Sequence, residues 1–345
     1  MYQKSSKLES EEHRLVEYLN SFDGKPFPRV KCCNSSRSLY CEECCRLLVP
    51  DGMLPDSISL RREATKTGIA DADNRQRPIR LPFNLQIVLD DRKGSATGLH
   101  AVALLNNSKD NPESHGDSRS VKLIDIANGD DVPNYYQHER SLPKGDDNSF
   151  DPIEQSETAF LLFPSPGESV AIESVAHQME TLVVLDCKWT KSSLSRKNAN
   201  LMKLKKVHLS NTYTTHYWRW HNAGDGCVST IEAIYYAAME VSEQKYQQAR
   251  DQSIATLESH IADQCNLMHL LWLFAHQRAA TLQAANRHGK PAPGTPEAKE
   301  LARSLRKQKG EYAWRSERNK EIGKILKEEC RRMKELALKD NTRQA

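Results

Sequence analysis

Leu182-Val183-Val184-Leu185-Asp186 is an uninterrupted apolar run that stops at a carboxylate. Such a run is typical of a strand in a parallel sheet, because helices cover both faces of the sheet. A second run, Ala159-Phe160-Leu161-Leu162-Phe163, stops at the rigid sequence Pro164-Ser165-Pro166-Gly167. The two runs therefore predict two buried strands, each of which leads into a loop.

Further strands and helices alternate around these runs. Leu85, Ile87 and Leu89 follow the two-residue period of a strand, and Val207–Leu209 is a further strand candidate. Helical patterns cover residues 99–105, 175–180, 231–241 and 257–282. The alternation predicts an α/β fold with a mostly parallel sheet flanked by helices. Ligands of such sheets bind beyond the carboxyl ends of the strands, which here carry Pro164–Gly167 and Asp186.

The rest of the chain is predicted to add smaller parts to this α/β domain, which we assign to residues 51–285. A short amphipathic helix is expected within residues 1–29, and a cysteine knuckle within 30–50. Residues 106–152 are rich in Asn, Asp, Ser, Gly and Pro and are predicted to be a variable insert with one strand-like island, Val121–Ile126. Residues 286–345 are expected to form a charged, basic helical tail.

Composition excludes a membrane protein and indicates where basic residues gather. The most apolar stretch, Leu267–Ala275, is far shorter than the roughly 20 residues that span a bilayer. The first residues contain no apolar signal segment, so we expect the protein in the nucleus, the cytoplasm or both. Residues 301–345 hold 14 Lys and Arg against 7 Asp and Glu, whereas the whole chain has a net charge of +3. A basic tail is compatible with nucleic-acid binding, although a solvated helix would look similar.

Five of the nine cysteines crowd into residues 32–45. In a reducing compartment such clustering indicates metal binding rather than disulfides. Cys41 and Cys44 have knuckle spacing, and Cys32 and Cys33 lie close enough in the sequence to complete a tetrahedral zinc site. The alternative is a cluster of free or buried thiols. A site with four sulfur ligands would be structural, because it leaves no coordination position open.

Asp186 and the residues after it can be interpreted in two ways. At the end of a buried strand its carboxylate could act as a general base, or it could cap a helix that contains Trp189. Trp189 could stack on a base or cofactor, or pack in the core. Ser229-Thr230-Ile231-Glu232 fits a capping box, and the same helix N-terminus could hold a carboxylate or phosphate.

Cations and aromatic residues alternate in the region between Asp186 and the capping box. This combination suits single-stranded or looped RNA, because cations contact phosphates and aromatic rings stack on bases. A solvated charged face is the other interpretation. The candidate RNA-binding residues are Lys188, Lys191, Arg196, Lys197, Trp218 and Arg219.

Taken together, these motifs resemble the DTW-domain family, the tRNA-uridine aminocarboxypropyltransferases, and most closely its eukaryotic type-1 branch. The resemblance covers roughly residues 30–285. Six motifs occur in the order of the family: Leu81-Pro82-Phe83, Thr97-Gly98-Leu99-His100-Ala101, Leu162-Phe163-Pro164-Ser165-Pro166, Leu185-Asp186-Cys187-Lys188-Trp189, Trp218-Arg219 and Ser229-Thr230-Ile231-Glu232-Ala233-Ile234-Tyr235-Tyr236.

The resemblance implies a SPOUT-like α/β fold, in which a knotted backbone occurs, and a specific reaction. The 3-amino-3-carboxypropyl group of S-adenosylmethionine would be transferred to N3 of a uridine in the tRNA D-loop, with release of 5′-methylthioadenosine. Asp186 matches the catalytic position. The residues that match the cofactor site are Phe163, Pro164, Ser165, Pro166, Trp189, Ser229, Thr230 and Glu232.

Two positions depart from the family pattern. The usual Asp-x-Thr-Trp has Lys188 in place of threonine, and Val30 occupies the position of the first knuckle cysteine, so that Cys32 would have to substitute. Two other functions therefore stay open. One is a zinc-knuckle tRNA- or RNA-binding protein without catalysis, and the other is a methyltransferase that uses S-adenosylmethionine to modify RNA.

Overall fold

A computed structural model describes most of the chain: residues 6–33, 35–59, 79–90, 92–105, 120–132, 157–165, 167–187, 198–218, 227–249 and 266–289, with 291, 297, 300, 301 and 304. The chain divides into two compact units. The first contains residues 1–217 and 221–283, and the second contains residues 218–220 and 284–345. The fold described below belongs to the first unit, except that its last helix continues into the second.

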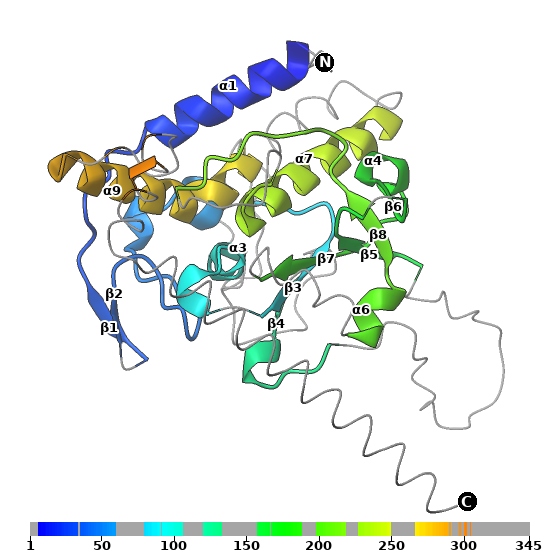
Figure 1. Cartoon of the computed structure of the whole chain (residues 1–345), viewed down its shortest axis with the longest axis horizontal. Coiled ribbons are helices and arrows are strands. Elements are labelled where there is room, and N and C mark those ends of the chain that lie inside the picture. Colours follow the sequence, from blue (N-terminus) through cyan, green and yellow to red (C-terminus); the bar gives the residue numbers. More distant parts are fainter. Residues whose placement is uncertain are drawn as a thin grey trace, which may run out of the picture. The chain divides into compact units, whose positions relative to one another are not determined.

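A six-stranded sheet forms the centre of the first unit, with the order β4-β3-β7-β5-β8-β6 (Figure 1). Every pair of neighbouring strands is parallel. The inner strands β7 and β5 carry the two apolar runs, and Val183, Leu161 and, on the neighbouring β3, Ile87 are fully buried. The strands are β3 (Asn84–Leu89), β4 (Val121–Asp125), β5 (Ala159–Leu162), β6 (Ser169–Ala171), β7 (Thr181–Asp186) and β8 (Lys205–His208).

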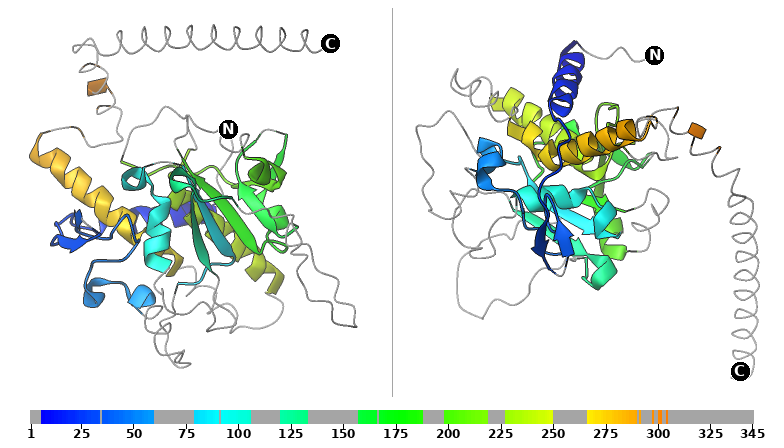
Figure 2. Two further views of the ribbon diagram at one scale, coloured as in Figure 1. Left: turned by 90° about the horizontal axis from the view of Figure 1, so that it is seen from below. Right: turned by 90° about the vertical axis from the view of Figure 1, so that its left-hand side faces the viewer.

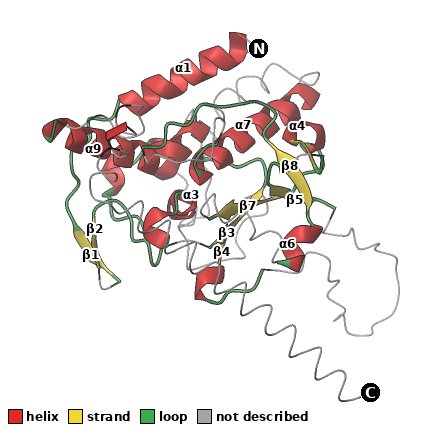
Figure 3. Ribbon diagram, viewed as in Figure 1, coloured by secondary structure: helices red, strands yellow, loops and turns green. Residues whose placement is uncertain are grey.

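Helices cover both faces of the sheet (Figures 1 and 3). On one face lie α3 (Gly98–Leu105), α4 (Ile172–Val175) and α7 (Thr230–Ala249), and α3 and α7 pack against each other. The other face is covered by α6 (Ala199–Lys203), whose Leu201 joins an apolar cluster with Val88 and Val183. Short 3-10 turns occur at Asp51–Met53, Lys93–Ser95, Ile126–Asn128 and Met268–Leu271.

The N-terminal helix α1 (Ser6–Asn20) packs near α9 (Trp272–Arg287), although they lie at opposite ends of the sequence (Figure 2). Arg278 donates to the backbone oxygen of Leu19 at 3.5 Å, and Phe22 contacts the ring of His276 with centroids 4.6 Å apart. A Cβ on Gly24 would lie 2.6 Å from the backbone oxygen of Ala279, so only glycine fits this close approach. The N-terminal segment is therefore part of the packed structure.

The α/β fold with a parallel sheet between helices is confirmed. The helix predicted at 175–180 lies one turn earlier, in α4, and residues 176–178 form a turn. The strand-like island predicted at Val121–Ile126 is confirmed as β4, which pairs with β3 in the sheet. The short edge strand β6 was not predicted, because Ser169–Ala171 has no apolar run.

The remaining fold predictions agree or lie outside the described residues. The helix predicted within 257–282 begins as a 3-10 turn at Met268 and continues as α9 to Arg287, while residues 251–265 are not described. Most of the predicted basic tail also lies outside the described residues. Among the described residues, no helix combines the length and apolar character that crossing a membrane requires.

Candidate functional site

Asp186 is the last residue of β7, which lies next to β3 at the point where the order of the strands reverses. The chain leaves the neighbouring strand β3 towards β4 on one side, whereas β8, the next strand after β7, lies on the other side of β7. Asp186 and Leu89 are paired in register at the carboxyl ends of β7 and β3. In open parallel sheets the crevice at such a switch point is where ligands bind. The topology therefore puts this carboxylate at the favoured ligand position.

The Asp186 carboxylate is buried and held by the backbone of α3. Its Oδ2 accepts a hydrogen bond from the Gly98 amide at 2.5 Å, and the residue is only 6% exposed. A Cβ on Gly98 would lie 2.7 Å from this oxygen and 3.0 Å from the side chain of Ile87. Glycine is therefore required here because the carboxylate, the strand and the helix meet too closely for any side chain.

The N-terminus of α7 meets the same place. A Cβ on Gly98 would also lie 3.2 Å from the side chain of Thr230, the first residue of α7. Thr97 connects the two helices, because its hydroxyl accepts a hydrogen bond from the Ile231 amide at 3.3 Å. Helix N-termini carry partial positive charge. The start of α3 contacts the Asp186 carboxylate through the Gly98 amide, and the adjoining start of α7 favours an acidic group of a ligand.

The predicted capping box at the start of α7 is present in part. Glu232 reaches back and accepts from the Ser229 amide at 2.8 Å, as expected. The Ser229 hydroxyl does not cap the helix; it donates to the same carboxylate at 2.6 Å. Glu232 also accepts from the Thr215 hydroxyl at 2.9 Å and from the His216 amide at 2.6 Å. Burial raises the pKa of Glu232, although these hydrogen bonds oppose the rise.

A second buried carboxylate of α7, Glu240, was not singled out from the sequence. It accepts from the Ser210 amide at 2.8 Å, from the Asn211 amide at 3.1 Å and from the Tyr213 hydroxyl at 2.8 Å. Glu232 and Glu240 together therefore hold residues 210–216, which we call the strap, against α7. The signal that could have found Glu240 is an acidic residue inside the apolar stretch from Ala237 to Val241.

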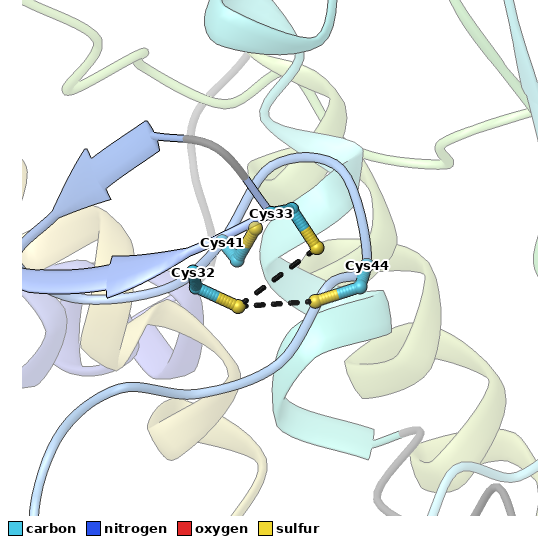
Figure 4. Close-up of side chains that lie close together, drawn as sticks. All are labelled: Cys32, Cys33, Cys41 and Cys44. Carbon is cyan, nitrogen blue, oxygen red and sulfur yellow. Dashed lines mark hydrogen bonds between the residues drawn. The ribbon is translucent and has the colours of Figure 1, made fainter.

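Four cysteine side chains converge in the knuckle (Figure 4). The hairpin of β1 (Val30–Cys32) and β2 (Ser35–Arg37) supplies the first pair, and the loop closed by the bridge between Tyr40 and Leu47 supplies the second. The Sγ atoms all lie within 4.8 Å of one another. The cluster is formed by Cys32, Cys33, Cys41 and Cys44, as predicted.

This cluster fits a tetrahedral zinc ion. Zn–S bonds of about 2.3 Å put the four sulfurs roughly 3.8 Å apart. The Sγ of Cys32 lies 3.9 Å from that of Cys33 and 3.6 Å from that of Cys44. Adjacent cysteines do not easily share one ion, but a φ of 44° at Cys33 turns its side chain towards the same centre. The four thiols could therefore hold a structural metal ion.

The electrostatics of the cluster favour one thiolate, because hydrogen bonding to Cys44 raises the pKa of Cys32 and Cys33 while the pKa of Cys44 itself is lowered. Burial alone would raise the pKa of Cys44. A hydrogen bond from the backbone of Arg46 and others from the three neighbouring thiols outweigh this effect and lower the pKa to about 7. Because the thiolate is the metal ligand, a thiol that ionises near neutral pH favours binding.

A family model described as the DTW domain matches residues 101–290, which is more than half of the chain. The chain belongs to the DTW-domain family. The matched region contains Asp186 and the start of α7, whereas the knuckle and Gly98 precede it. Comparisons with curated proteins and with solved structures gave no significant match.

The described residues of the predicted cofactor loop lie at the same edge of the sheet as Asp186. Phe163, Pro164 and Ser165 follow β5, the strand next to β7. The Phe163 amide donates to Val207 of β8 at 2.9 Å, and the Ser165 amide donates to the Ser169 hydroxyl at 3.1 Å. The loop is thus fixed to its neighbours. Pro166, Lys188 and Trp189 lie outside the described residues.

Most of the candidate RNA-binding residues of the DTW domain cannot be placed. Trp218 is buried and 9% exposed, so its ring does not offer an open face for stacking on a base. The other candidates lie outside the described residues: Lys188, Lys191, Arg196, Lys197 and Arg219. Their proposed role rests on the sequence pattern.

Proposed function

We propose that this DTW-domain protein is a tRNA-modifying transferase. It would transfer the 3-amino-3-carboxypropyl group of S-adenosylmethionine to N3 of a D-loop uridine and release 5′-methylthioadenosine. One observation carries the proposal. The motif aspartate, Asp186, is buried at the switch point of the sheet, and the Gly98 amide orients its carboxylate. The family membership supports the same assignment.

The reaction requires a positioned carbon and an activated nitrogen. In S-adenosylmethionine the sulfonium activates three adjacent carbons, so the product depends on which carbon lies in line with uridine N3. A bond forms between N3 and Cγ of the methionine part as the bond between Cγ and sulfur breaks. The sulfonium thereby becomes the neutral thioether of 5′-methylthioadenosine.

Asp186 is the proposed general base. Uridine N3 carries a proton at neutral pH and is a poor nucleophile until that proton is removed. The carboxylate would accept the proton while N3 attacks. The contact with the Gly98 amide gives the carboxylate one orientation, which would direct it towards the proton on N3.

Other residues would bind the cofactor and the tRNA. The methionine carboxylate fits the N-terminus of α7. The Ser229 amide already donates to Glu232, so we assign this contact to Thr230. Residues 163–166 and Trp189 would flank the adenosine. Because Glu232 already accepts four hydrogen bonds, we assign it to shaping the site through Ser229 and the strap. The cysteine cluster would hold a structural zinc ion.

The test combines a cofactor assay with one substitution. Purified protein, labelled S-adenosylmethionine and unmodified tRNA should yield 5′-methylthioadenosine and an aminocarboxypropyl group on uridine. Asp186→Asn should keep cofactor binding and lose about 100-fold or more of its turnover, because it removes the base. The matched control is Glu180→Gln, an exposed acidic residue just before β7 at the opposite end of the strand. Unchanged turnover in Asp186→Asn would remove this residue as the base.

Lys188 in place of the usual threonine favours a second candidate, a tRNA-binding protein without catalysis. Tight tRNA binding without binding of S-adenosylmethionine in calorimetry would support it. Methyl transfer is the third candidate. Mass spectrometry of the modified nucleoside distinguishes methyl from aminocarboxypropyl addition by mass.

A further inference from the structure

We propose that the cysteine knuckle positions the Asp186 carboxylate through the loop between β3 and α3, with Lys93 and Tyr40 as the positioning residues. The knuckle (residues 30–50) lies outside the region that the family model matches. It nevertheless contacts this loop at two places. The functional consequence rests on the proposed role of Asp186, whereas the structural coupling can be tested by itself.

The first contact is an ionic bridge from the knuckle to the sheet. The Lys93 ammonium lies 3.1 Å from a carboxylate oxygen of Glu43 and 3.2 Å from one of Asp125, the last residue of β4. The side chains of Lys93 and Asp125 are 19% and 9% exposed. Little water screens the attraction between Lys93 and Asp125, so it is stronger than that of a surface ion pair. The Glu43 side chain is 60% exposed, so its contact with Lys93 is the weaker half of the bridge. Lys93 therefore joins the knuckle to the sheet edge that carries Asp186.

The loop that contains Lys93 is short and fastened at several points. The Ala96 amide donates to the Lys93 oxygen at 3.2 Å, which closes a tight turn. Thr97 then accepts from the start of α7, and Gly98 donates to Asp186. With so few residues between these attachments, a shift of Lys93 must move the Gly98 amide. The position of that amide is what orients the carboxylate.

The second contact joins the knuckle to α3 itself. Tyr40 directly precedes the ligand Cys41, and its ring meets the ring of His100 edge to face, with centroids 5.4 Å apart. His100 is 1% exposed and lies two residues after Gly98 on α3. Tyr40 thus holds the first turn of α3 from the knuckle side.

These contacts predict that the metal and the carboxylate are coupled. The knuckle has little regular structure besides one short hairpin and one bridge, so a bound metal would fix Tyr40 and Glu43 in place. Removing the metal would loosen both contacts together. Gly98 and the start of α3 would then open more often, although they are distant in sequence from every cysteine of the cluster.

Amide hydrogen exchange of the full-length protein tests this coupling without an activity assay. In Lys93→Met, exchange of the peptide covering residues 92–105 should rise about tenfold, which corresponds to one lost charged contact. Glu43→Gln should raise the exchange of this peptide less, because the ion pair between Lys93 and Asp125 is kept. The matched control is Lys206→Met on β8, three strands away from β3, which breaks the ion pair with Glu168 and should leave this peptide unchanged.

Removal of the metal by a chelator supplies the decisive comparison. Chelation should raise exchange of the same peptide in the wild type and raise it by a smaller factor in Lys93→Met, because only the contact between Tyr40 and His100 then remains to be loosened. An equal factor in both proteins would overturn the proposal, as would unchanged exchange in both Lys93→Met and Glu43→Gln.

Turnover then separates this inference from the proposed function. The bridge variants should lower kcat more than they raise KM. If exchange changes as expected and no transferase activity is found, the coupling stands and the proposed function fails. If the enzyme is active and exchange of residues 92–105 does not respond, the coupling fails and the proposed function stands.

Discussion

The site leaves no room for a side chain at Gly98. In Gly98→Ala the new methyl group would lie 2.7 Å from the Asp186 carboxylate and 3.0 Å from Ile87, so one of them must move. We expect a loss of about 1–3 kcal/mol in the free energy of unfolding and a fall in turnover of about tenfold or more.

Gly52→Ala is the control for this substitution. No atom lies within 4 Å of a Cβ built on Gly52, which is exposed. Its urea unfolding curve and its turnover should match those of the wild type. Equal behaviour of the two variants would show that the close approach at Gly98 is not needed.

The sequence identifies Asp186 but not the partner of its carboxylate. Position at the end of an apolar run leaves two roles open, a base or a cap for the helix that follows. Instead, the carboxylate contacts the N-terminus of α3, which comes far earlier in the chain. A contact between residues so distant in sequence has no local pattern. The same reason hides the bridge from Lys93 to Asp125.

At the scale of elements, α7 holds the strap through two carboxylates, and Glu240 is the one that can be tested without touching the capping box. In Glu240→Gln the new NH₂ group must face a donor, because Ser210, Asn211 and Tyr213 all donate to the carboxylate. We expect a loss of about 1–3 kcal/mol in the free energy of unfolding and faster proteolysis within residues 210–216.

Glu243→Gln on the same helix is the control, since it makes the same change of side chain and can still accept the 3.1 Å hydrogen bond from Gln247 one turn away. A strap that resists protease equally in both variants would contradict the role of Glu240.

The sequence can predict that an acidic residue such as Glu240 is buried, but not which segment donates hydrogen bonds to it. An acidic residue in an apolar stretch must be satisfied, yet the sequence does not say by which segment.

The packing of the N-terminal segment on α9 should depend on pH. The ring of His276 lies among Phe22, Phe27 and Trp272, with centroids 4.6, 4.8 and 4.4 Å away. Burial lowers the pKa of His276 from 6.5 to about 4. The unfolded chain therefore binds a proton before the folded chain does, and stability is lost as pH falls from about 6.5 to about 4.

His276→Phe keeps a ring and removes this titration. Between pH 7 and pH 5 its free energy of unfolding should fall by about 1 kcal/mol less than that of the wild type, a figure reduced because the histidine is partly exposed. Urea unfolding at several pH values measures the difference. His13→Gln, at an exposed position on α1, is the control and should keep the wild-type pH dependence. A parallel pH dependence of His276→Phe and the wild type would contradict the prediction.

The elements differ in how far the sequence predicts them. Strands β5 and β7 are foreseeable because central strands must be apolar on both faces. The edge strand β6 has three residues and no apolar run. Strand β4 is surrounded by polar sequence, which conceals that it pairs with β3 over five residues. Pairing at the edge of a sheet depends on the neighbouring strand, so composition alone cannot reveal it.

At the scale of the whole molecule, charge is distributed unevenly, and this leads to a prediction about tRNA binding. Residues 301–345 hold 14 Lys and Arg against 7 Asp and Glu. Each cation that contacts a phosphate releases counterions, so the logarithm of the binding constant falls linearly with the logarithm of the salt concentration. If the tail contacts tRNA, its cations must contribute to that slope.

Replacing Arg303, Arg306, Lys307 and Lys309 by Gln in the full-length protein tests this contribution. The salt slope of tRNA binding should decrease by up to about 3 or 4 if all four cations contact phosphates, and affinity at low salt should weaken. The control replaces four exposed cations by Gln that lie outside both the tail and the candidate RNA-binding segment: Lys25, Lys31, Arg80 and Lys122. Both proteins have the same change in net charge, so a general loss of attraction would affect them equally. A decrease confined to the tail variant would assign the contact to the tail, whereas equal slopes would mean that the tail does not touch tRNA.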